Sequence, residues 1–262
     1  MKRVIVLLAI SLSTSAFAGM TYQIESNSTG LRSASITGKV AVDGARMRMD
    51  VITGDHMLFN DNTLVLSNDG GRTMSVFDPS TRNYFELNLE DALGSATSVL
   101  RNLPGSVKVS FENPNVSVRD AGDGGTVQGY PTRRYLLDAS YDVVVDAMGQ
   151  KMTSHTKMTT ESWATQVLSS ESTNFLQLRA FRTGIEALDK LIQAQSDTIK
   201  GMPLKQVSTI TVNQGAGDIT MSTTSLVTNI ERKAIDASQF TIPSGYTKVD
   251  DPITKMMKQF KQ

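Results

Sequence analysis

The fold is decided by residues 39–51, which read Lys39-Val40-Ala41-Val42-Asp43-Gly44-Ala45-Arg46-Met47-Arg48-Met49-Asp50-Val51. Asp-Gly is a favoured pair for a two-residue hairpin turn, because both central positions of that turn need positive φ. The sequence therefore predicts a turn at Asp43-Gly44, with Val42 opposite Ala45 and Val40 opposite Met47. The same arrangement sorts the side chains into one apolar face (Val40, Val42, Met47, Met49 and Val51) and one polar face (Lys39, Arg46, Arg48 and Asp50). Turn chemistry and side-chain alternation both indicate an antiparallel sheet with one solvated face.

Strand patterns continue on both sides of a helical segment. Leu64, Leu66, Met74 and Val76 alternate with other residues, and Phe85 and Leu87 follow the turn at Asp78-Pro79-Ser80. A four-and-three spacing of apolar residues then predicts a helix over 89–103, ended by Pro104-Gly105. Two long strands are expected over 133–146 and 151–163, joined by a loop at residues 147–150.

The apolar period changes from that of a strand to that of a helix between Glu171 and Lys200. Leu178, Phe181, Ile185, Leu188, Ile192 and Ile199 fall on one helical face, which Gln195 completes. Strands return over 204–212 and 218–231.

We therefore expect an α+β fold with a single domain over residues 19–250, including a helical insertion at about 165–200. The main element is a large curved antiparallel sheet, an incomplete barrel, whose apolar face is covered by amphipathic helices.

Residues 1–18 have the pattern of a secretory signal peptide. Lys2 and Arg3 precede a short apolar run, and Ala16-Phe17-Ala18 places small residues where a signal peptidase cuts. Gly19, rather than a lipid-bearing cysteine, follows the expected cut. We predict an exported periplasmic protein, cleaved near Ala18 and not lipid-anchored. Residues 251–262 form a short basic amphipathic tail, for which packing against the protein and peripheral contact with an anionic membrane are both open.

The charge balance argues against a nucleic-acid partner. Removal of Lys2 and Arg3 with the leader leaves 24 basic residues against 26 acidic ones. A net charge near −2, without any run of basic residues, lacks the electrostatic footprint of a protein that binds phosphate backbones.

Four segments resemble a known family. They are DGGRTMSVFDPSTRNYFELNL (69–89), VQGYPTRRYLL (127–137), IKGMPLKQ (199–206) and FTIPSGYTKV (240–249). Together they are similar to a bacterial family of exported envelope proteins without assigned function, which resembles the LolA-like periplasmic lipoprotein carriers. Gly129–Tyr135 matches that family's Gly-Tyr-x-x-x-x-Tyr strand entry, and Gly201-Met202-Pro203-Leu204 matches its Gly-aromatic-Pro-Leu turn except at Met202. The resemblance implies a half-barrel with a hydrophobic cavity.

Patterns typical of enzymes are scarce. The chain has two histidines and no cysteine, and it lacks the nucleophile-elbow, zinc-protease and phosphate-loop motifs. Asp69-Gly70-Gly71 and the glycine-rich stretch at 120–125 are typical of turns, with a calcium loop as the alternative. We therefore predict a non-catalytic protein with no cofactor and no resident metal.

Methionine is frequent in the expected strands, and its flexible thioether suits surfaces that accept variable apolar shapes. Ordinary core filling is the alternative. The predicted cavity residues are Val40, Val42, Met47, Met49, Val51, Met74, Leu178, Phe181 and Ile185. The expected function is binding or carriage of a lipid, an acyl chain or another hydrophobic ligand. The alternative is an envelope interaction module with a fully packed core, whose partner is another envelope protein.

Overall fold

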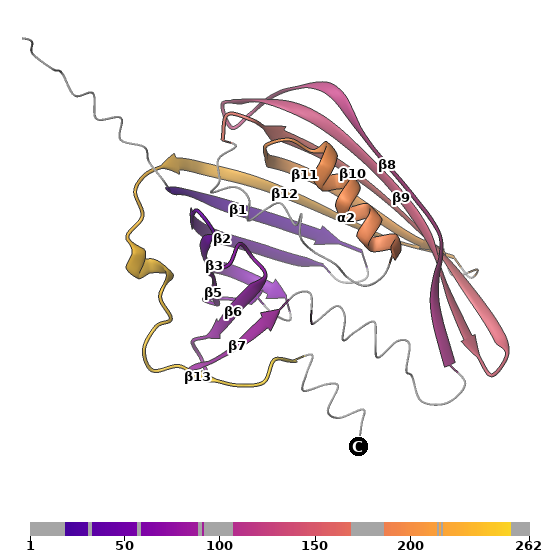
Figure 1. The fold of residues 1–262 in the computed structure, drawn as a ribbon, viewed down its shortest axis with the longest axis horizontal. Coiled ribbons are helices and arrows are strands. Elements are labelled where there is room, and N and C mark those ends of the chain that lie inside the picture. The colour runs from indigo at the N-terminus through magenta and orange to yellow at the C-terminus, as the bar shows by residue number, and fades with distance from the viewer. Residues whose placement is uncertain are drawn as a thin grey trace, which may run out of the picture.

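The computed structural model describes residues 19–30, 33–56, 59–88, 91, 107–168, 186–213, 215 and 217–252. Most of them belong to one sheet (Figure 1). Its first strands are β1 (Gly19–Thr29), β2 (Ala34–Asp43), β3 (Arg46–His56), β4 (Phe59–Asn60), β5 (Leu64–Ser67), β6 (Thr73–Asp78) and β7 (Asn83–Asn88). The later strands are β8 (Val107–Val127), β9 (Tyr130–Ala147), β10 (Gln150–Thr165), β11 (Met202–Asn213), β12 (Asp218–Arg232) and β13 (Thr247–Lys248).

The sheet is open, because its two outer strands, β13 and β8, do not pair with each other. The strand order is β13-β7-β6-β5-β3-β2-β1-β12-β11-β10-β9-β8, and β4 pairs with β3 alone. The first described strand, β1, lies in the middle of the sheet; the following strands step outward to β7, the chain crosses to the opposite edge at β8, and the later strands step back inward to β12. The antiparallel pairing of β1 with β12 therefore joins the first and last parts of the sheet. This confirms the expected large, incompletely closed antiparallel sheet.

The β2–β3 hairpin forms, but its register differs from the predicted one. Asp43 pairs with Arg46 and Val42 with Met47, so the turn residues are Gly44 and Ala45. Gly44 has a φ of 60° whereas Ala45 is not among the positive-φ residues, a pattern typical of a type II′ turn with glycine first. Because the pairing moves by two residues, every side chain keeps its predicted face.

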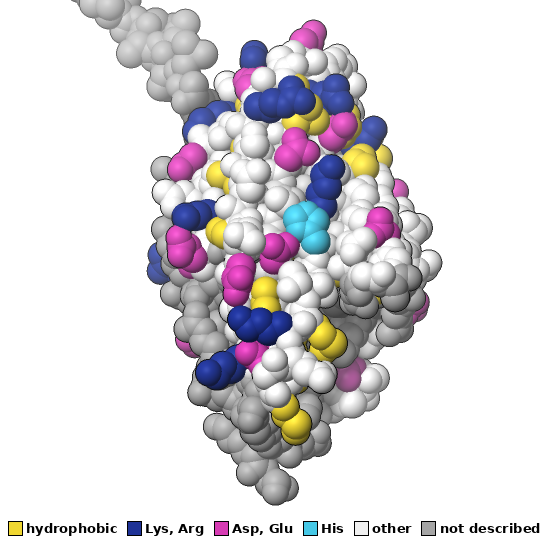
Figure 2. Space-filling view, turned by 90° about the vertical axis from the view of Figure 1, so that its right-hand side faces the viewer, with side chains coloured by type: hydrophobic (Ala, Val, Ile, Leu, Met, Phe, Trp, Pro, Cys, Tyr) yellow, Lys and Arg dark blue, Asp and Glu magenta, His cyan; other side chains and the backbone are white. Residues whose placement is uncertain are grey.

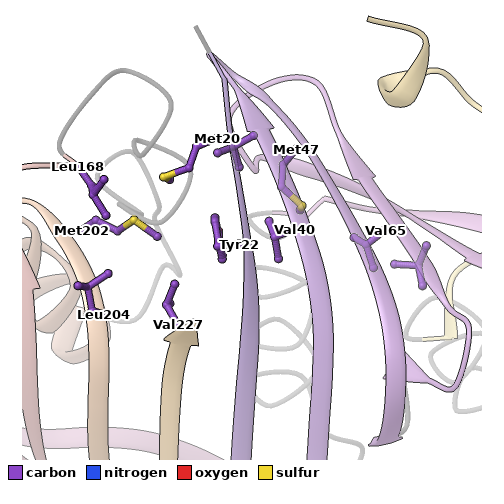
Figure 3. Close-up of a cluster of buried hydrophobic side chains, with 11 residues drawn as sticks. Met20, Tyr22, Val40, Met47, Val65, Leu168, Met202, Leu204 and Val227 are labelled. Atoms are coloured by element: carbon purple, nitrogen blue, oxygen red, sulfur yellow. The ribbon is translucent and has the colours of Figure 1, made fainter. Parts of the chain in front are cut away.

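The apolar core lies on the concave side of the sheet (Figure 3). Apart from Leu168, which follows β10, its fully buried members come from both halves of the sheet, so the β1–β12 junction runs through the core. They are Met20, Tyr22, Val40, Val42, Met47, Val65, Val76, Leu168, Met202, Leu204 and Val227.

The expectation that several helices cover the sheet is not supported. Among the described residues there is a single α-helix, α2 (Glu186–Thr198), together with the short 3-10 helix η2 (Ala237–Phe240). Helix α2 lies inside the curve of the sheet and packs against β8 and β9 (Figure 1). The helix expected over 89–103, the expected tail and the leader fall outside the described residues, apart from a few at their ends. No helix in the described part of the chain is long and apolar enough to cross a membrane.

Candidate functional site: a pocket beneath helix α2

A pocket of about 240 Å³ lies between α2 and the concave face of β1, β11 and β12. Its apolar walls come from two sources, the inward side chains of the strands and one face of the helix. The apolar lining residues are Tyr22, Ile24, Leu204 and Val227 from the sheet, Ile192 from α2, Ile199 just after it, and Pro203. Gln195, Ser196, Gln206 and Ser225 add polar groups. Since α2 contributes one wall, its position determines whether the pocket exists.

A β-bulge shapes the strand junction beside the pocket. The β1–β12 register shifts between Thr21 and Gln23, which leaves Tyr22 opposite an extra residue of β12. Asn229 has a φ of 52° there and donates a hydrogen bond from Nδ2 to Gln23 Oε1 at 3.2 Å. Asparagine tolerates this left-handed conformation better than most residues. The bulge lets both Val227 and Ile230 pack into the same core cluster although they are three residues apart.

Gly201 determines the path of the chain into the start of β11. Its φ is 92°, and a Cβ at this position would lie 2.2 Å from the carbonyl oxygen of Thr165. Only glycine therefore allows the chain to pass this close to the end of β10. The next inward residues, Met202 and Leu204, are fully buried, and Leu204 forms part of the pocket wall. The Gly-Met-Pro-Leu motif noticed in the sequence thus builds one side of the site.

Tyr22 is a polar group in an apolar place. Its side chain is buried, and no hydrogen bond joins its hydroxyl to another described residue. Burial raises the pKa of the Tyr22 phenol well above its usual range, so the hydroxyl keeps its proton at neutral pH. The pocket therefore has a neutral hydrogen-bond donor in its wall.

The predicted cavity residues of the strands lie beside this pocket, not in its wall. Val40, Val42 and Met47 are buried in the core cluster, against which Met49 and Met74 pack. Val51 is also buried. Val40 pairs with Tyr22, which connects this cluster to the pocket. Leu178, Phe181 and Ile185 lie outside the described residues. Their assignment as cavity residues stays a prediction.

Several lining residues were missed by sequence reasoning. Tyr22 and Ile24 carry the alternating signal of a strand, but that signal stops after two residues because serines follow at positions 26 and 28. Val227 stands with Leu226 in the otherwise polar stretch 222–229, so no alternation of apolar and polar residues marks its inward face. Ile192, Gln195 and Ile199 did stand out, since they belong to the predicted helical face.

The aspartates of the glycine-rich turns serve the backbone. Asp69 accepts hydrogen bonds from the amide of Thr73 and from Ser67 Oγ, each at 3.0 Å. Asp120 and Asp123 accept from the amides of Gly122 and Gly125 at 2.8 Å. These contacts are those of ordinary turns. In the described part of the chain, no group of three or more metal-ligating side chains is found.

One outer face of the molecule carries charges of both signs. Figure 2 shows basic and acidic side chains interspersed there, with hydrophobic side chains scattered singly between them. On the convex side, Trp163 lies between two cations, with Lys205 Nζ 4.7 Å and the Arg134 guanidinium carbon 5.8 Å from the ring centroid. The cations pair with the aromatic ring and are not gathered into a basic patch.

A protein-family model matches residues 28–246, and its description is "Domain of unknown function (DUF4412)". The chain belongs to this family. The match confirms the resemblance to a family without assigned function. No curated protein matches the chain in sequence.

Solved structures similar to this DUF4412 protein are distant in sequence. An uncharacterized conserved protein from Thermus thermophilus is 7% identical, covers 90% of this chain and 92% of its own, and has a TM-score of 0.38. A LolA superfamily protein from Nitrosomonas europaea is 8% identical, with coverages of 87% and 91% and a TM-score of 0.32. The structure described as PNGF-II is 14% identical with a TM-score of 0.35, and the match covers 93% of this chain but 33% of that one.

Proposed function

We propose that the protein binds a hydrophobic ligand, a lipid or an acyl chain, in the pocket beneath α2, and that it acts without catalysis in the periplasm. The observation that carries the proposal is the pocket itself, whose walls are the apolar side chains of three strands and one helix. The leader-like sequence at residues 1–18 supports the location.

The size of the pocket indicates what it holds. Pockets for drug-sized ligands occupy about 300–1,000 Å³. A volume of about 240 Å³ suits one short apolar chain or a segment of a longer one. Each methylene group that is buried there contributes about 0.8 kcal/mol, so a few carbons give useful affinity.

The direct test is a binding titration with N-phenyl-1-naphthylamine, an uncharged apolar dye whose fluorescence rises in apolar surroundings. We expect saturable binding to the wild-type protein. Gln195→Trp, which directs a bulky ring into the pocket from α2, should weaken binding by about tenfold or more, equivalent to about 1.4 kcal/mol.

Helix α2 offers a matched control. Gln193 lies on the same helix but is exposed, so Gln193→Trp adds the same ring outside the pocket. Its affinity for the dye should equal that of the wild type. Equal affinities for the two tryptophan variants, with both folded by circular dichroism, would place the dye elsewhere and remove the support for this pocket. Mass spectrometry of lipids extracted from natively purified protein then identifies the natural ligand.

A second candidate function is an envelope interaction module. It is favoured by the β9–β10 hairpin, where Met148 is 87% exposed and Met152 is 62% exposed. Solvent-exposed methionine is common on adaptable binding surfaces. If this function is correct, Met152→Lys abolishes capture of a partner from envelope extracts, whereas Ile52→Lys, at another exposed apolar residue, leaves capture unchanged.

A further inference from the structure

The floor of the pocket changes from apolar to polar along its strands. Ile24 of β1 pairs with Val227 of β12, and two residues further along Ser26 pairs with Ser225. Residues two apart on a strand point to the same face, so the serines continue the row begun by the apolar pair. Gln206 of β11 stands opposite Ser225, and Ser162 of β10 stands opposite Gln206. A polar row therefore crosses four strands directly beside the apolar wall.

A second polar row follows the first. It consists of Ser28, Thr223, Ser208 and Thr160, again one residue from each of β1, β12, β11 and β10. Hydroxyl pairs join neighbouring strands within each row, at 3.0 Å for Ser26–Ser225 in the first row and at 2.9 Å for both Ser28–Thr223 and Thr160–Ser208 in the second. All these residues are uncharged. The concave floor therefore offers hydroxyl and amide groups without a net charge.

These polar groups keep hydrogen-bonding capacity for a ligand. A pair of hydroxyls uses one proton, so one hydroxyl of Ser26 and Ser225 still has a proton to donate. Gln206 donates to Ser162 Oγ at 3.5 Å, which leaves its Oε1 as an acceptor. Tyr22 is the independent indication of a ligand, because its side chain is buried and lines the pocket, and no hydrogen bond joins its hydroxyl to another described residue.

An anionic head group would lack a counter-charge in this pocket. Lys205 is the charged residue of the lining, but its side chain points to the face of β11 opposite to that of Gln206, because residues alternate along a strand, and its ammonium lies over the Trp163 ring there. Arg134, on the other side of that ring, forms an ion pair with Glu161 at 2.8 Å. Removing a carboxylate from water without a paired cation costs several kcal/mol. A head group that is polar but neutral avoids this cost.

We propose that the ligand is a neutral amphiphile, with its apolar chain against Ile24, Leu204 and Val227 and the oxygens of an uncharged, hydroxyl-bearing head group bound by Tyr22, Ser225 and Gln206. This inference rests on the proposed function and specifies the ligand class of the same pocket. The head group is of the glycerol type, since several hydroxyls are needed to use both donors and acceptors.

The test is displacement of N-phenyl-1-naphthylamine by 1-monolauroylglycerol and by laurate at neutral pH. The two competitors carry the same acyl chain and differ in the charge of the head group. We expect 1-monolauroylglycerol to bind at least about tenfold more tightly, because laurate has to bury an unpaired charge. Equal affinity, or tighter binding of laurate, overturns the neutral head group and leaves the hydrophobic pocket intact. If neither competitor nor the dye binds, the proposed function itself fails.

Two variants locate the head group. Ser225→Ala and Tyr22→Phe each remove one hydroxyl. Each should lower the affinity for 1-monolauroylglycerol by about two- to tenfold and change the affinity for laurate little. Thr224→Ala is the matched control, because Thr224 neighbours Ser225 on β12 but is exposed. If the affinity for 1-monolauroylglycerol is the same in Ser225→Ala, Tyr22→Phe and Thr224→Ala, the assignment of the head group to Tyr22 and Ser225 is overturned.

Discussion

Gly201 shows how one residue sets the geometry of the candidate site. Its positive φ of 92° and the 2.2 Å approach of a Cβ to the Thr165 carbonyl oxygen are separate obstacles to any other residue. The first strains the backbone of an L-residue, and the second forces β10 and β11 apart. Because Leu204 follows on the same strand, a shift there also moves the pocket wall.

Gly201→Ala should therefore lower the free energy of unfolding by at least about 2 kcal/mol, measured by urea denaturation. The control is Gly44→Ala, where φ is 60° but a Cβ would meet nothing within 4 Å. That variant carries only the conformational penalty of about 1–2 kcal/mol. If Gly201→Ala and Gly44→Ala lower the free energy of unfolding by the same amount, the close approach to Thr165 does not contribute to the loss.

Asp69 links stability to pH. Burial tends to raise the pKa of Asp69, but the hydrogen bonds from Thr73 and Ser67 outweigh burial and hold that pKa below its usual range. The folded state thus binds fewer protons than the unfolded state once the pH falls to about 4. Stability that Asp69 contributes above this pH is lost as the pH falls through the lowered, folded-state pKa.

Asp69→Asn should make the protein less stable at pH 6 but reduce the further loss between pH 6 and 3. The urea midpoint at the two pH values measures both effects. If the urea midpoint falls by the same amount between pH 6 and pH 3 in Asp69→Asn as in the wild type, Asp69 does not contribute to the loss of stability in acid.

At the scale of the element, the β2–β3 hairpin separates what sequence can predict from what it cannot. The alternation of apolar and charged residues predicted both faces correctly. The register was wrong by two residues, because Asp43-Gly44 and Gly44-Ala45 both make acceptable hairpin turns. The ion pair between Asp43 and Arg46, which closes the observed turn, depends on that register and so could not decide it in advance.

The candidate site was less predictable than the sheet. Helical spacing identified Ile192, Gln195 and Ile199, because such spacing is a local signal. Tyr22 and Val227 meet through the pairing of the first strand with the last long one, a contact that no local pattern specifies. The bulge at Asn229 then shifts the register within that pairing, so even the known strand order would not have placed Val227 and Ile230 on one face.

The β9–β10 hairpin can be improved at its turn. Met148 and Gly149 both have positive φ, 55° and 83°, as a type I′ turn requires. Asparagine adopts this conformation more readily than methionine. Met148→Asn should therefore raise stability by about 0.5–1 kcal/mol, seen as a higher melting temperature.

Ala147→Asn is the control for that change, since Ala147 pairs with Gln150 in the strand and is not a positive-φ residue. No stabilisation is expected there. A gain in both variants would mean that the added amide side chain, and not the geometry of the turn, raises the stability.

At the scale of the whole molecule, the final described segment protects the outer part of the sheet near β7. Strand β13 pairs with β7 in parallel, and the amide of Val249 donates to the carbonyl of Tyr84 at 2.8 Å. Between β12 and β13, the ring of Phe240 lies beneath the Arg46 guanidinium, whose carbon is 4.9 Å from the ring centroid. As a result β5 is buried on both faces, with Val65 in the main core and Leu64 and Leu66 in a second, smaller cluster.

Tyr246 closes this smaller cluster. Its ring meets the fully buried ring of Phe77 edge to face at 5.2 Å, and Phe77 stacks on Tyr84 at 4.9 Å. Tyr246→Ala should lower the free energy of unfolding by about 1–2 kcal/mol, because the aromatic pair and the apolar burial are both lost. Tyr246→Phe keeps the ring and should change stability little.

The position of Tyr246 makes a sharper test possible. The pocket beneath α2 lies among β1, β11 and β12, whereas Tyr246 packs near β5, β6 and β7. If the sheet transmits no strain between these regions, Tyr246→Ala binds N-phenyl-1-naphthylamine as tightly as the wild type in the absence of urea. A weakened affinity in the folded variant would instead mean that the edge strands set the curvature of the sheet, because the pocket wall keeps all of its side chains.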